Sequence, residues 1–439
     1  MKRMCTLLLG AVLTLSMNAQ RTELNDFGFR FYDKVQQIYA LDQYEVENCI
    51  ISPLSAQMAL GMLMNGATGD VLKDFLNTLG ISAYSTEEVN AYLKNLSETL
   101  TTASDSVRVE LANAIWVDID RTLQDQFKQV VTEYYNAEAS TLDLFSEECL
   151  PVINGWANQK THGLIPSIFN GPPCCKTILA NALYFKGSWA APFEEYFTEK
   201  KDFVCTNQSV VSAPMMWGVM DVPYAELDDY RVVELAYYSE PYGEFSLLVF
   251  LPKEVDNVSS ITYDLYTEAL QKLYYDWVEL EFPKFSFELR YSLVEPWEAM
   301  GLPMDGYDGI CDAIYFIRDA GQLVSFSVDE EGTEAAAITY IDVTECVDDV
   351  QEPSVFFHVD HNFQFVLCHR PTQTPLFIGH INTLEGEYRG EYNDVQPVSV
   401  APRTGGVYDL SGRRINVNVN NSKLKKGIYI KDGKKTMVR

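Results

Sequence analysis

This chain of 439 residues has only five histidines, and its 62 Asp and Glu residues are so numerous that no carboxylate pair indicates acid–base or metal chemistry. The closest pair of its five histidines lies in His358-Val359-Asp360-His361, which could chelate a metal ion in principle, but no known ligand spacing accompanies it. The cysteines show no Cys-x-x-Cys spacing. There is also no Gly-x-Ser-x-Gly, His-Glu-x-x-His or phosphate-binding glycine loop. The sequence therefore predicts no cofactor and no metal site, and it gives an enzyme no specific support.

A different chemistry is indicated by residues 328–344. Their first part is acidic and small, and their second part is rich in β-branched and aromatic residues, which favour a strand. Read with a period of two, the acidic side chains of the second part fall on one face. The other face carries no charge: Thr333, Ala335, Ala337, Thr339, Ile341 and Val343. This alternation predicts a strand with one buried face. The simplest interpretation is an ordinary sheet strand with a flexible lead-in.

Composition limits the partners of the chain. A length of 439 residues fits one large domain or two ordinary ones, and 47% hydrophobic residues permit a sizeable core. The net charge of −29 argues against nucleic acid and anionic membranes as partners. Residues 403–439, however, contain ten basic and only two acidic residues. A basic segment on an acidic chain predicts a separate module.

The first 19 residues have the composition of a signal peptide. Lys2 and Arg3 precede an apolar run at residues 6–15, which is too short to span a bilayer as a helix. Residues 16–19 then supply a cleavage site before Gln20. The alternative is a buried N-terminal helix. No later segment has the length and hydropathy of a membrane span. We therefore expect an exported protein, extracellular or at the cell surface, with no integral membrane segment.

The predicted helices and strands, which must position these residues, follow one another along the chain in no regular order. Helical periodicity is seen at residues 22–44 and 152–161, and Ser52 with Pro53 forms a good helix start. A methionine stripe follows in that helix and indicates core packing. Strand patterns are seen at residues 48–51, 107–117, 178–185, 232–235, 245–252, 278–285, 363–367 and 375–381. This mixture without βαβ regularity predicts an α+β fold.

Several separated motifs, in their usual order, resemble those of the serpin family. They cover residues from about 25 to 384 and include Asn48-Cys49-Ile50-Ile51-Ser52-Pro53-Leu54-Ser55, Asn181-Ala182-Leu183-Tyr184-Phe185-Lys186-Gly187-Ser188-Trp189, Phe282-Pro283-Lys284-Phe285, Glu330-Glu331-Gly332-Thr333-Glu334-Ala335-Ala336-Ala337 and Pro375-Leu376-Phe377-Ile378-Gly379. The resemblance implies a serpin fold over residues 20–384, with three β-sheets, several helices and an exposed reactive-centre loop. It also implies suicide trapping, in which a protease cuts the loop and forms an acyl-enzyme, and the cut loop then inserts into the central sheet.

The resemblance assigns a hinge to residues 330–337. Its members would be Glu330, Gly332, Thr333, Ala335, Ala336 and Ala337. The small side chains would let the loop enter a closed sheet quickly. The uncharged face would become buried without stranding an unpaired ion.

The same alignment places a second group of residues beneath the opening sheet and at its breach. Ser52, Ser55 and Asn181 would lie beneath the sheet, Trp189 at the breach, and Lys284 would pair with Glu330. Gln322 stands where the family commonly has a histidine, and its amide can still donate and accept hydrogen bonds. The alternative for each is an ordinary core or surface residue.

The family register places the scissile bond after Cys346 and before Val347. A slip of one residue would place Glu345 before the cut, and Cys346 could instead be an incidental thiol. No Lys or Arg occurs between Arg318 and Arg370. Trypsin-like proteases are therefore disfavoured, since their pocket carboxylate needs a basic residue. Elastase-like, glutamate-specific and papain-like proteases remain as targets, each in a covalent complex.

Two further expectations concern charge and the C-terminus. Residues 85–100 correspond to the heparin-binding helix of some serpins but contain three glutamates and one lysine, so no activation by heparin is expected. Residues 403–439 resemble the C-terminal sorting domains of type IX secretion in Bacteroidetes, with residues 385–402 as the linker. The alternative is a basic, partly ordered appendage. The chain thus resembles an exported bacterial serpin. A non-inhibitory serpin that acts as a binding module or a protease substrate is the main alternative.

Overall fold

The computed structural model describes residues 2–39, 48–103, 106–239, 243–255, 259–311, 315–317, 320–333 and 352–384, together with four short strands in the C-terminal segment. The chain divides into two compact units, Met1–Arg389 and Gly390–Arg439. The second unit holds a four-stranded sheet with the order β20-β19-β21-β22. Its strands are β19 (Val407–Tyr408), β20 (Arg414–Ile415), β21 (Gly427–Lys431) and β22 (Lys434–Val438).

The helices of the first unit begin at residues suited to capping. Ser52 accepts a hydrogen bond from the backbone N–H of Ser55, with Pro53 at the first helical position. Ser85 and Glu88 form a capping box. The described helices are α1 (Lys2–Tyr39), α2 (Pro53–Met64), α3 (Gly69–Leu79), α4 (Thr86–Leu100), α5 (Asp125–Tyr135), α6 (Leu150–Lys160), α7 (Tyr263–Lys272) and α8 (Val294–Met300). None of them, within the described residues, is both long and apolar enough to cross a membrane.

A nine-stranded sheet forms one layer of the first unit. Its order is β1-β18-β17-β9-β8-β7-β10-β16, with β6 paired to β7. Its strands are β1 (Cys49–Ile51), β6 (Glu199–Val204), β7 (Val210–Glu226), β8 (Tyr230–Ala236), β9 (Phe245–Pro252), β10 (Tyr274–Pro283), β16 (Val355–His358), β17 (Phe363–His369) and β18 (Thr374–Ile381). β7 pairs with β10 along most of its length and with β8 at its end. Two of the three expected sheets are therefore continuous through β7.

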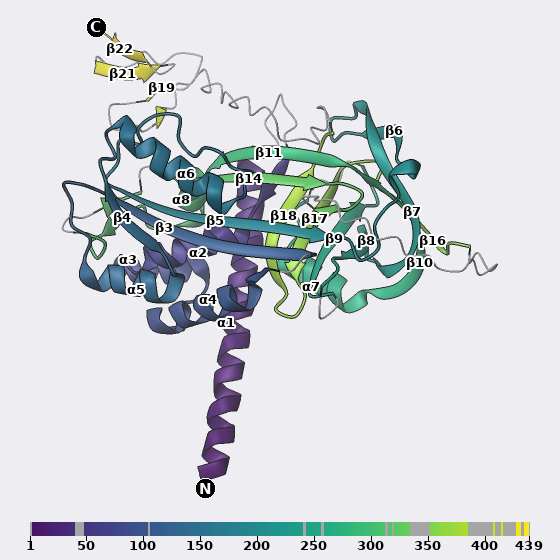
Figure 1. The fold of residues 1–439 in the computed structure, drawn as a ribbon, viewed down its shortest axis with the longest axis horizontal. Helices are drawn as coiled ribbons and strands as arrows, with labels where there is room; N and C mark the ends of the chain where they lie inside the picture. Colours follow the sequence, from purple (N-terminus) through teal and green to yellow (C-terminus); the bar gives the residue numbers. More distant parts are fainter. Residues whose placement is uncertain are drawn as a thin grey trace. The chain divides into compact units, whose positions relative to one another are not determined.

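A seven-stranded sheet forms the other main layer and carries the candidate site (Figure 1). Its order is β11-β14-β15-β5-β3-β2, with β4 paired to β3. Its strands are β2 (Thr102–Ala103), β3 (Val107–Asp118), β4 (Glu138–Leu142), β5 (Thr177–Ser188), β11 (Phe285–Ser292), β14 (Gly321–Val328) and β15 (Gly332–Thr333). Two short strands, β12 (Asp305–Tyr307) and β13 (Tyr315–Phe316), pair separately.

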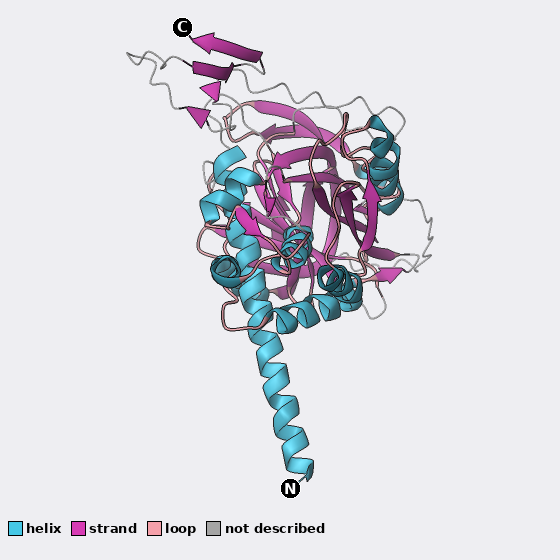
Figure 2. Cartoon of the chain, turned by 90° about the vertical axis from the view of Figure 1, so that its left-hand side faces the viewer, coloured by secondary structure: helices cyan, strands magenta, loops and turns pink. Residues whose placement is uncertain are grey.

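Helices pack against the sheets, as Figure 2 also shows. The predicted methionine stripe of α2 is core, since Met58, Met62 and Met64 are almost fully buried. α6 packs on β3 and β5, where the Trp116 and Trp156 rings meet edge to face at 5.3 Å. The α+β prediction is confirmed. The predicted helix at residues 22–44 is observed as far as Tyr39, and residues 40–47 lie outside the described part.

Candidate functional site between strands β5 and β14

Within the described residues, only the two-residue strand β15 lies between β14 and β5 in the seven-stranded sheet. No ladder joins these two described strands directly, because β15 lies between them. β15 contains only Gly332 and Thr333, whereas β5 has 12 residues and β14 has eight. Thr333 pairs with Val328 on one side and with Gly187 on the other. Among the described residues, the sheet is therefore open from Thr333 to the far end of β5.

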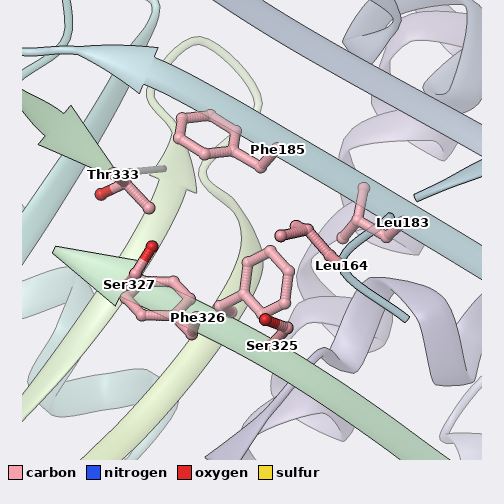
Figure 3. Close-up of a pocket in the computed structure, with 8 residues that line it drawn as sticks. Leu164, Leu183, Phe185, Ser325, Phe326, Ser327 and Thr333 are labelled. Carbon is pink, nitrogen blue, oxygen red and sulfur yellow. The ribbon is translucent and has the colours of Figure 1, made fainter. Parts of the chain in front are cut away.

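A small cavity of about 20 Å³ lies in this opening next to Thr333 (Figure 3). Leu183 and Phe185 approach it from β5, and residues 325–327 approach it from β14. Leu164 and Phe377 complete the lining, which contains no charged side chain. A cavity of this size holds about one water molecule. An entering strand must therefore bring small, uncharged side chains on this face.

Thr333 is the first residue of the uncharged face, and it is 3% exposed. Its hydroxyl lies 2.5 Å from the hydroxyl oxygen of Tyr237, which follows β8. The Tyr237 ring stacks on Trp189 at a centroid distance of 4.6 Å. Burial raises the pKa of Tyr237, so the phenol stays protonated. Thr333 thus faces inward and is held by an uncharged hydrogen bond.

Close backbone contact explains the glycine before Thr333. A Cβ added to Gly332 would overlap the carbonyl oxygen of Gly187. Gly187 itself lies against the Tyr237 ring, so β5 has no room to withdraw. A side chain at position 332 would therefore push β15 out of the sheet.

A tight turn connects β14 to β15. The Asp329 carboxylate accepts hydrogen bonds from the backbone N–H groups of Glu331 and Gly332, at 2.9 and 3.1 Å. Burial nevertheless raises the pKa of Asp329, and it outweighs these two bonds. The Trp189 indole N–H donates to the Asp329 carbonyl at 2.9 Å, and the Trp189 backbone N–H donates to the Glu331 carbonyl at 2.8 Å. Trp189 therefore fixes the turn from the β5 side.

Glu330 forms an ion pair at the base of β15. The Lys284 Nζ lies 2.7 Å from one carboxylate oxygen, and the Thr198 hydroxyl donates to the other at 2.7 Å. The side chains of Lys284 and Glu330 are 19% and 8% exposed. Burial by itself raises the pKa of Glu330, but the hydrogen bonds from Lys284 and Thr198 outweigh it and lower that pKa. Lys284 and Glu330 are thus the pair that the family resemblance implies.

Gln322 joins β14 to the start of α2. Its amide oxygen accepts from the Ser52 backbone N–H at 2.8 Å, and its amide nitrogen donates to the Ser52 carbonyl at 2.9 Å. The Ser52 hydroxyl caps α2 by accepting from Ser55 at 3.1 Å. Gln322 therefore supplies both a donor and an acceptor to the backbone at the start of α2.

Asn181, the other residue expected beneath the sheet, bonds along β5 and β3. Its amide donates to the Asn113 side chain at 2.9 Å. Its Oδ1 is buried and has no hydrogen-bond partner within the described part of the chain. An unsatisfied buried acceptor is costly.

The remaining site predictions fall outside the described residues. They are the hinge alanines Ala335, Ala336 and Ala337 and the reactive-site residues Glu345, Cys346 and Val347. Conversely, Tyr237 and Asp329 contribute to the site without having been predicted from the sequence. Tyr237 lies outside every motif, while Asp329 could have been found from its place before a Glu-Glu-Gly turn, since Asp often accepts such turn N–H bonds.

The strand histidines are mostly paired inside the protein. Burial lowers the pKa of His369 to about 4 and that of His380 to about 3, so both are neutral at physiological pH. His361 bonds to the Asp360 carboxylate and to the Pro252 carbonyl. His162 lies 2.9 Å from Glu110. The described histidines thus satisfy local hydrogen bonds, and His358 is the one with two carboxylates beside it.

Comparison with known proteins identifies the arrangement. A family model described as serpin (serine protease inhibitor) matches residues 22–384. Iripin-1 of Ixodes ricinus is 31% identical over 378 residues, which cover 82% of this chain and 93% of the relative. Human Serpin I2 is 27% identical over 368 residues, covering 78% of this chain and 89% of the relative.

Solved structures share the fold. The native state of Tengpin, a thermophilic serpin, superposes with a TM-score of 0.72 at 24% identity and covers 83% of this chain and 94% of its own. Human thyroxine-binding globulin in complex with thyroxine has a TM-score of 0.73 at 22% identity and covers 84% and 99%. These likenesses establish a common fold.

Proposed function

Because the chain belongs to the serpin family, we propose that it is an exported inhibitor that traps its target protease covalently. The observation that carries this proposal is the uncharged strand position between β14 and β5, entered by Gly332 and Thr333. The uncharged face of residues 333–343 matches the uncharged lining of the cavity. A strand with this alternation can therefore fill the gap without burying an unpaired ion.

Chain length supports insertion. Thirteen residues separate Thr333 from the proposed scissile bond after Cys346. At roughly 3.3 Å per residue they span roughly 43 Å, whereas the ten residues of β5 from Gly187 back to Ile178 span roughly 33 Å. A fully inserted segment therefore carries its cut end past the far end of β5. Any protease attached to that end would cross the length of the sheet.

The covalent step follows ordinary acyl transfer. The protease nucleophile attacks the carbonyl of Cys346, the amide bond to Val347 breaks, and the new amine leaves with a proton delivered by the protease. The Cys346 acyl group stays on the protease. Insertion of residues 334–346 before hydrolysis would then distort the protease and preserve the acyl bond. Inhibition therefore requires the loop to insert faster than the acyl-enzyme is hydrolysed.

The loop sequence limits the targets. No Lys or Arg lies between Arg318 and Arg370, so trypsin-like proteases lack the residue that their pocket carboxylate binds. Elastase-like proteases fit a cut after Cys346, a glutamate-specific protease fits a cut after Glu345, and papain-like cysteine proteases fit the same acyl chemistry. The only partner required is the protease, with no cofactor, heparin or nucleic acid.

The alternative is a non-inhibitory member that binds a ligand or serves only as a protease substrate. The solved complex of thyroxine-binding globulin with thyroxine is one observation in its favour. In that case a cut near Cys346 would release two fragments and leave the gap unfilled. The absence of charge from both the gap lining and the 333–343 face favours trapping.

A panel of purified proteases separates these two functions. The full chain is mixed with elastase-like, chymotrypsin-like, glutamate-specific, papain-like and trypsin-like enzymes and run on denaturing gels. Trapping predicts a complex that resists SDS with at least one enzyme other than the trypsin-like one. Sequencing the released C-terminal peptide identifies the bond. Cleavage near Cys346 by one or more of these enzymes, with no complex formed by any of them, would favour the substrate alternative over trapping.

Export is proposed from the two ends of the sequence. Residues 1–19 would direct secretion, and residues 403–439, with their small four-stranded sheet, would act as a type IX sorting module. Expression of the full chain and of a chain ending at residue 402 in a host with type IX secretion tests this. Loss of surface or extracellular protein in the shorter chain alone is expected. Equal secretion of the full chain and the shorter chain would contradict a sorting role for residues 403–439.

A further inference from the structure

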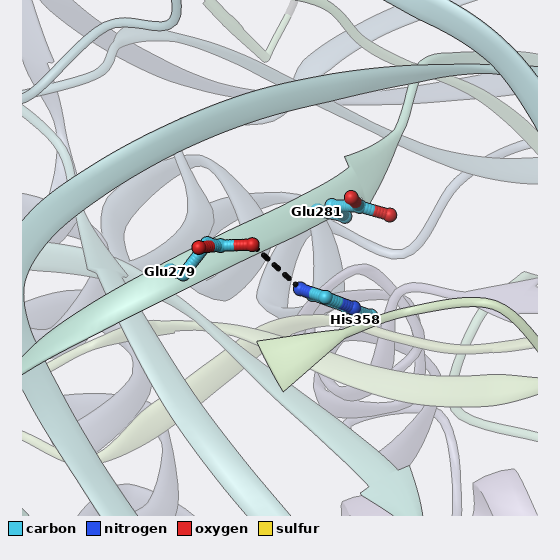
Figure 4. A group of neighbouring side chains, drawn as sticks. All are labelled: Glu279, Glu281 and His358. Carbon is cyan, nitrogen blue, oxygen red and sulfur yellow. Dashed lines mark hydrogen bonds and ion pairs between the residues drawn. The ribbon is translucent and has the colours of Figure 1, made fainter. Parts of the chain in front are cut away.

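A cluster outside the β5–β14 gap joins two carboxylates and one imidazole. Glu279 and Glu281 come from β10, and His358 comes from β16. One donor atom from each residue lies within 4.8 Å of the others, and all three side chains are half-buried. Figure 4 shows the Glu279 carboxylate facing the His358 imidazole, with Glu281 on the same strand.

Strand alternation places these side chains on one face. Val278, Leu280 and Phe282 are fully buried, so the glutamates between them point outward. β16 runs parallel to β10 with His358 opposite Glu281, and the neighbouring Phe357 is also fully buried. The register therefore brings two acidic groups from one strand to an imidazole from the next.

The charge in the cluster is incompletely balanced by protein groups. His358 Nε2 lies 3.2 Å from Glu279 Oε1. Lys201, from β6, lies 2.5 Å from Glu281 Oε1. On β7, the residues opposite the two glutamates are Val219 and Trp217, which carry no charge. With His358 neutral, as a metal ligand must be, the two carboxylates and one lysine leave one net negative charge, which favours a cation at this place.

We propose that Glu279, Glu281 and His358 form a Zn²⁺ site that joins β16 to β10. Zinc accepts carboxylate oxygen and imidazole nitrogen together, and three protein ligands leave a fourth position for water. Tetrahedral coordination at about 2.0 Å requires donor atoms about 3.3 Å apart, so small side-chain rotations bring the present donors into place. Calcium and magnesium are disfavoured because they prefer six or more oxygen ligands.

The position of the site gives zinc a mechanical role, and this second step rests on the proposed inhibitory function. β16 is an edge strand of four residues that pairs only with β10 among the described strands. It is also the first strand after residues 334–351. β15 ends at Thr333 and β16 begins at Val355, so an uncut chain that lengthened β15 into the gap would pull on the start of β16. Zinc bound across β10 and β16 would therefore keep β16 paired with β10 and disfavour insertion before the protease cuts.

Calorimetric titration of the full chain with Zn²⁺ tests the site itself. The protein is first stripped with a chelator and its accessible thiols are alkylated, because the exposed Cys174 could bind zinc. One site is expected, with affinity lowered more than about 100-fold by His358→Ala or Glu279→Gln, since a direct ligand matters more than its supporting groups. His162→Ala, which removes another histidine–glutamate pair, is the matched control and keeps the site.

Lys201→Met is expected to raise the zinc affinity, whereas the two ligand variants lower it. Removing the competing ammonium group frees the Glu281 carboxylate, so zinc should bind more tightly. Equal zinc binding by the native chain, His358→Ala and Glu279→Gln would overturn the site. So would tighter binding of Mg²⁺ than of Zn²⁺. Circular dichroism of each variant verifies folding, and neither result depends on protease inhibition.

Hydrogen exchange tests the role of zinc at β16. Zinc is expected to slow exchange of the β16 amides in the native chain and to leave the His358→Ala chain unchanged. Zinc binding without slower exchange would overturn the mechanical role while leaving the site intact. Failure of protease trapping in the panel experiment would affect neither measurement, so the proposals fail separately.

Discussion

Replacing Thr333 with arginine tests whether the hinge must enter the gap. Thr333 is 3% exposed, its hydroxyl contacts Tyr237, and the cavity beside it has no charged lining. An arginine there must either bury its guanidinium group or stay outside the sheet. In the uncut chain the two-residue strand β15 can leave the sheet and keep the guanidinium group in water, but insertion after cleavage must bury it. Burying an unpaired charge costs several kcal/mol, and about 2.7 kcal/mol added to the insertion barrier already slows insertion about 100-fold.

The assay is the stoichiometry of inhibition. Insertion competes with hydrolysis of the acyl-enzyme, so slower insertion converts an inhibitor into a substrate. Thr333→Arg should therefore be cut at the same bond while consuming many molecules per protease inactivated. Thr333→Val is the control: it keeps the shape and introduces no charge, and leaving the buried Tyr237 hydroxyl without this partner costs about 1–3 kcal/mol of stability, so it should still inhibit. Unchanged stoichiometry in Thr333→Arg would refute the insertion argument.

Three further predictions concern the ends of the gap and the acidic helix. Gln322→Ala leaves the Ser52 N–H without its acceptor, while the Ser52 carbonyl keeps the Ala56 N–H, and it should lower the free energy of unfolding by about 1–3 kcal/mol, measured in urea; loss below about 0.5 kcal/mol would contradict this role. The lowered pKa of Glu330 adds stability that is present above its ordinary value of 4.5 and is lost as the pH falls through the lower folded value, so melting temperature should fall there in the native chain. Glu330→Gln should lack that loss, and parallel curves would exclude the ion pair as its source. Heparin should not accelerate inhibition, because residues 86–100 form α4 with Glu87 and Glu88 in its first turn; a faster rate would show another basic surface.

Local signals predicted many elements correctly. The Ser52-Pro53 start of α2 and the apolar runs that became β5 and β9 follow directly from capping and periodicity. β7, the longest of the described strands, was not predicted. It contains Pro214 and Pro223, and proline usually argues against a central strand. Here the Pro214 carbonyl accepts from Lys284, so tertiary contacts overrode the local signal.

The candidate site was only partly predictable for a similar reason. The Lys284–Glu330 pair follows from motif alignment, and the structure places the two side chains 2.7 Å apart. The contact of Thr333 with Tyr237 joins residues 96 positions apart and has no local pattern. Gln322 differs from the usual family residue, and only the fold reveals that its partner is the Ser52 backbone.

The central claim is that cleavage lets residues after Thr333 fill the position between β14 and β5. Thermal unfolding of the intact chain and of the chain cut near Cys346 measures this most directly. Filling the gap adds ladders on both sides of a new strand, so the cut chain should melt several degrees or more above the intact chain, as expected for a gain of several kcal/mol. A cut chain that melts at or below the temperature of the intact chain would contradict the account.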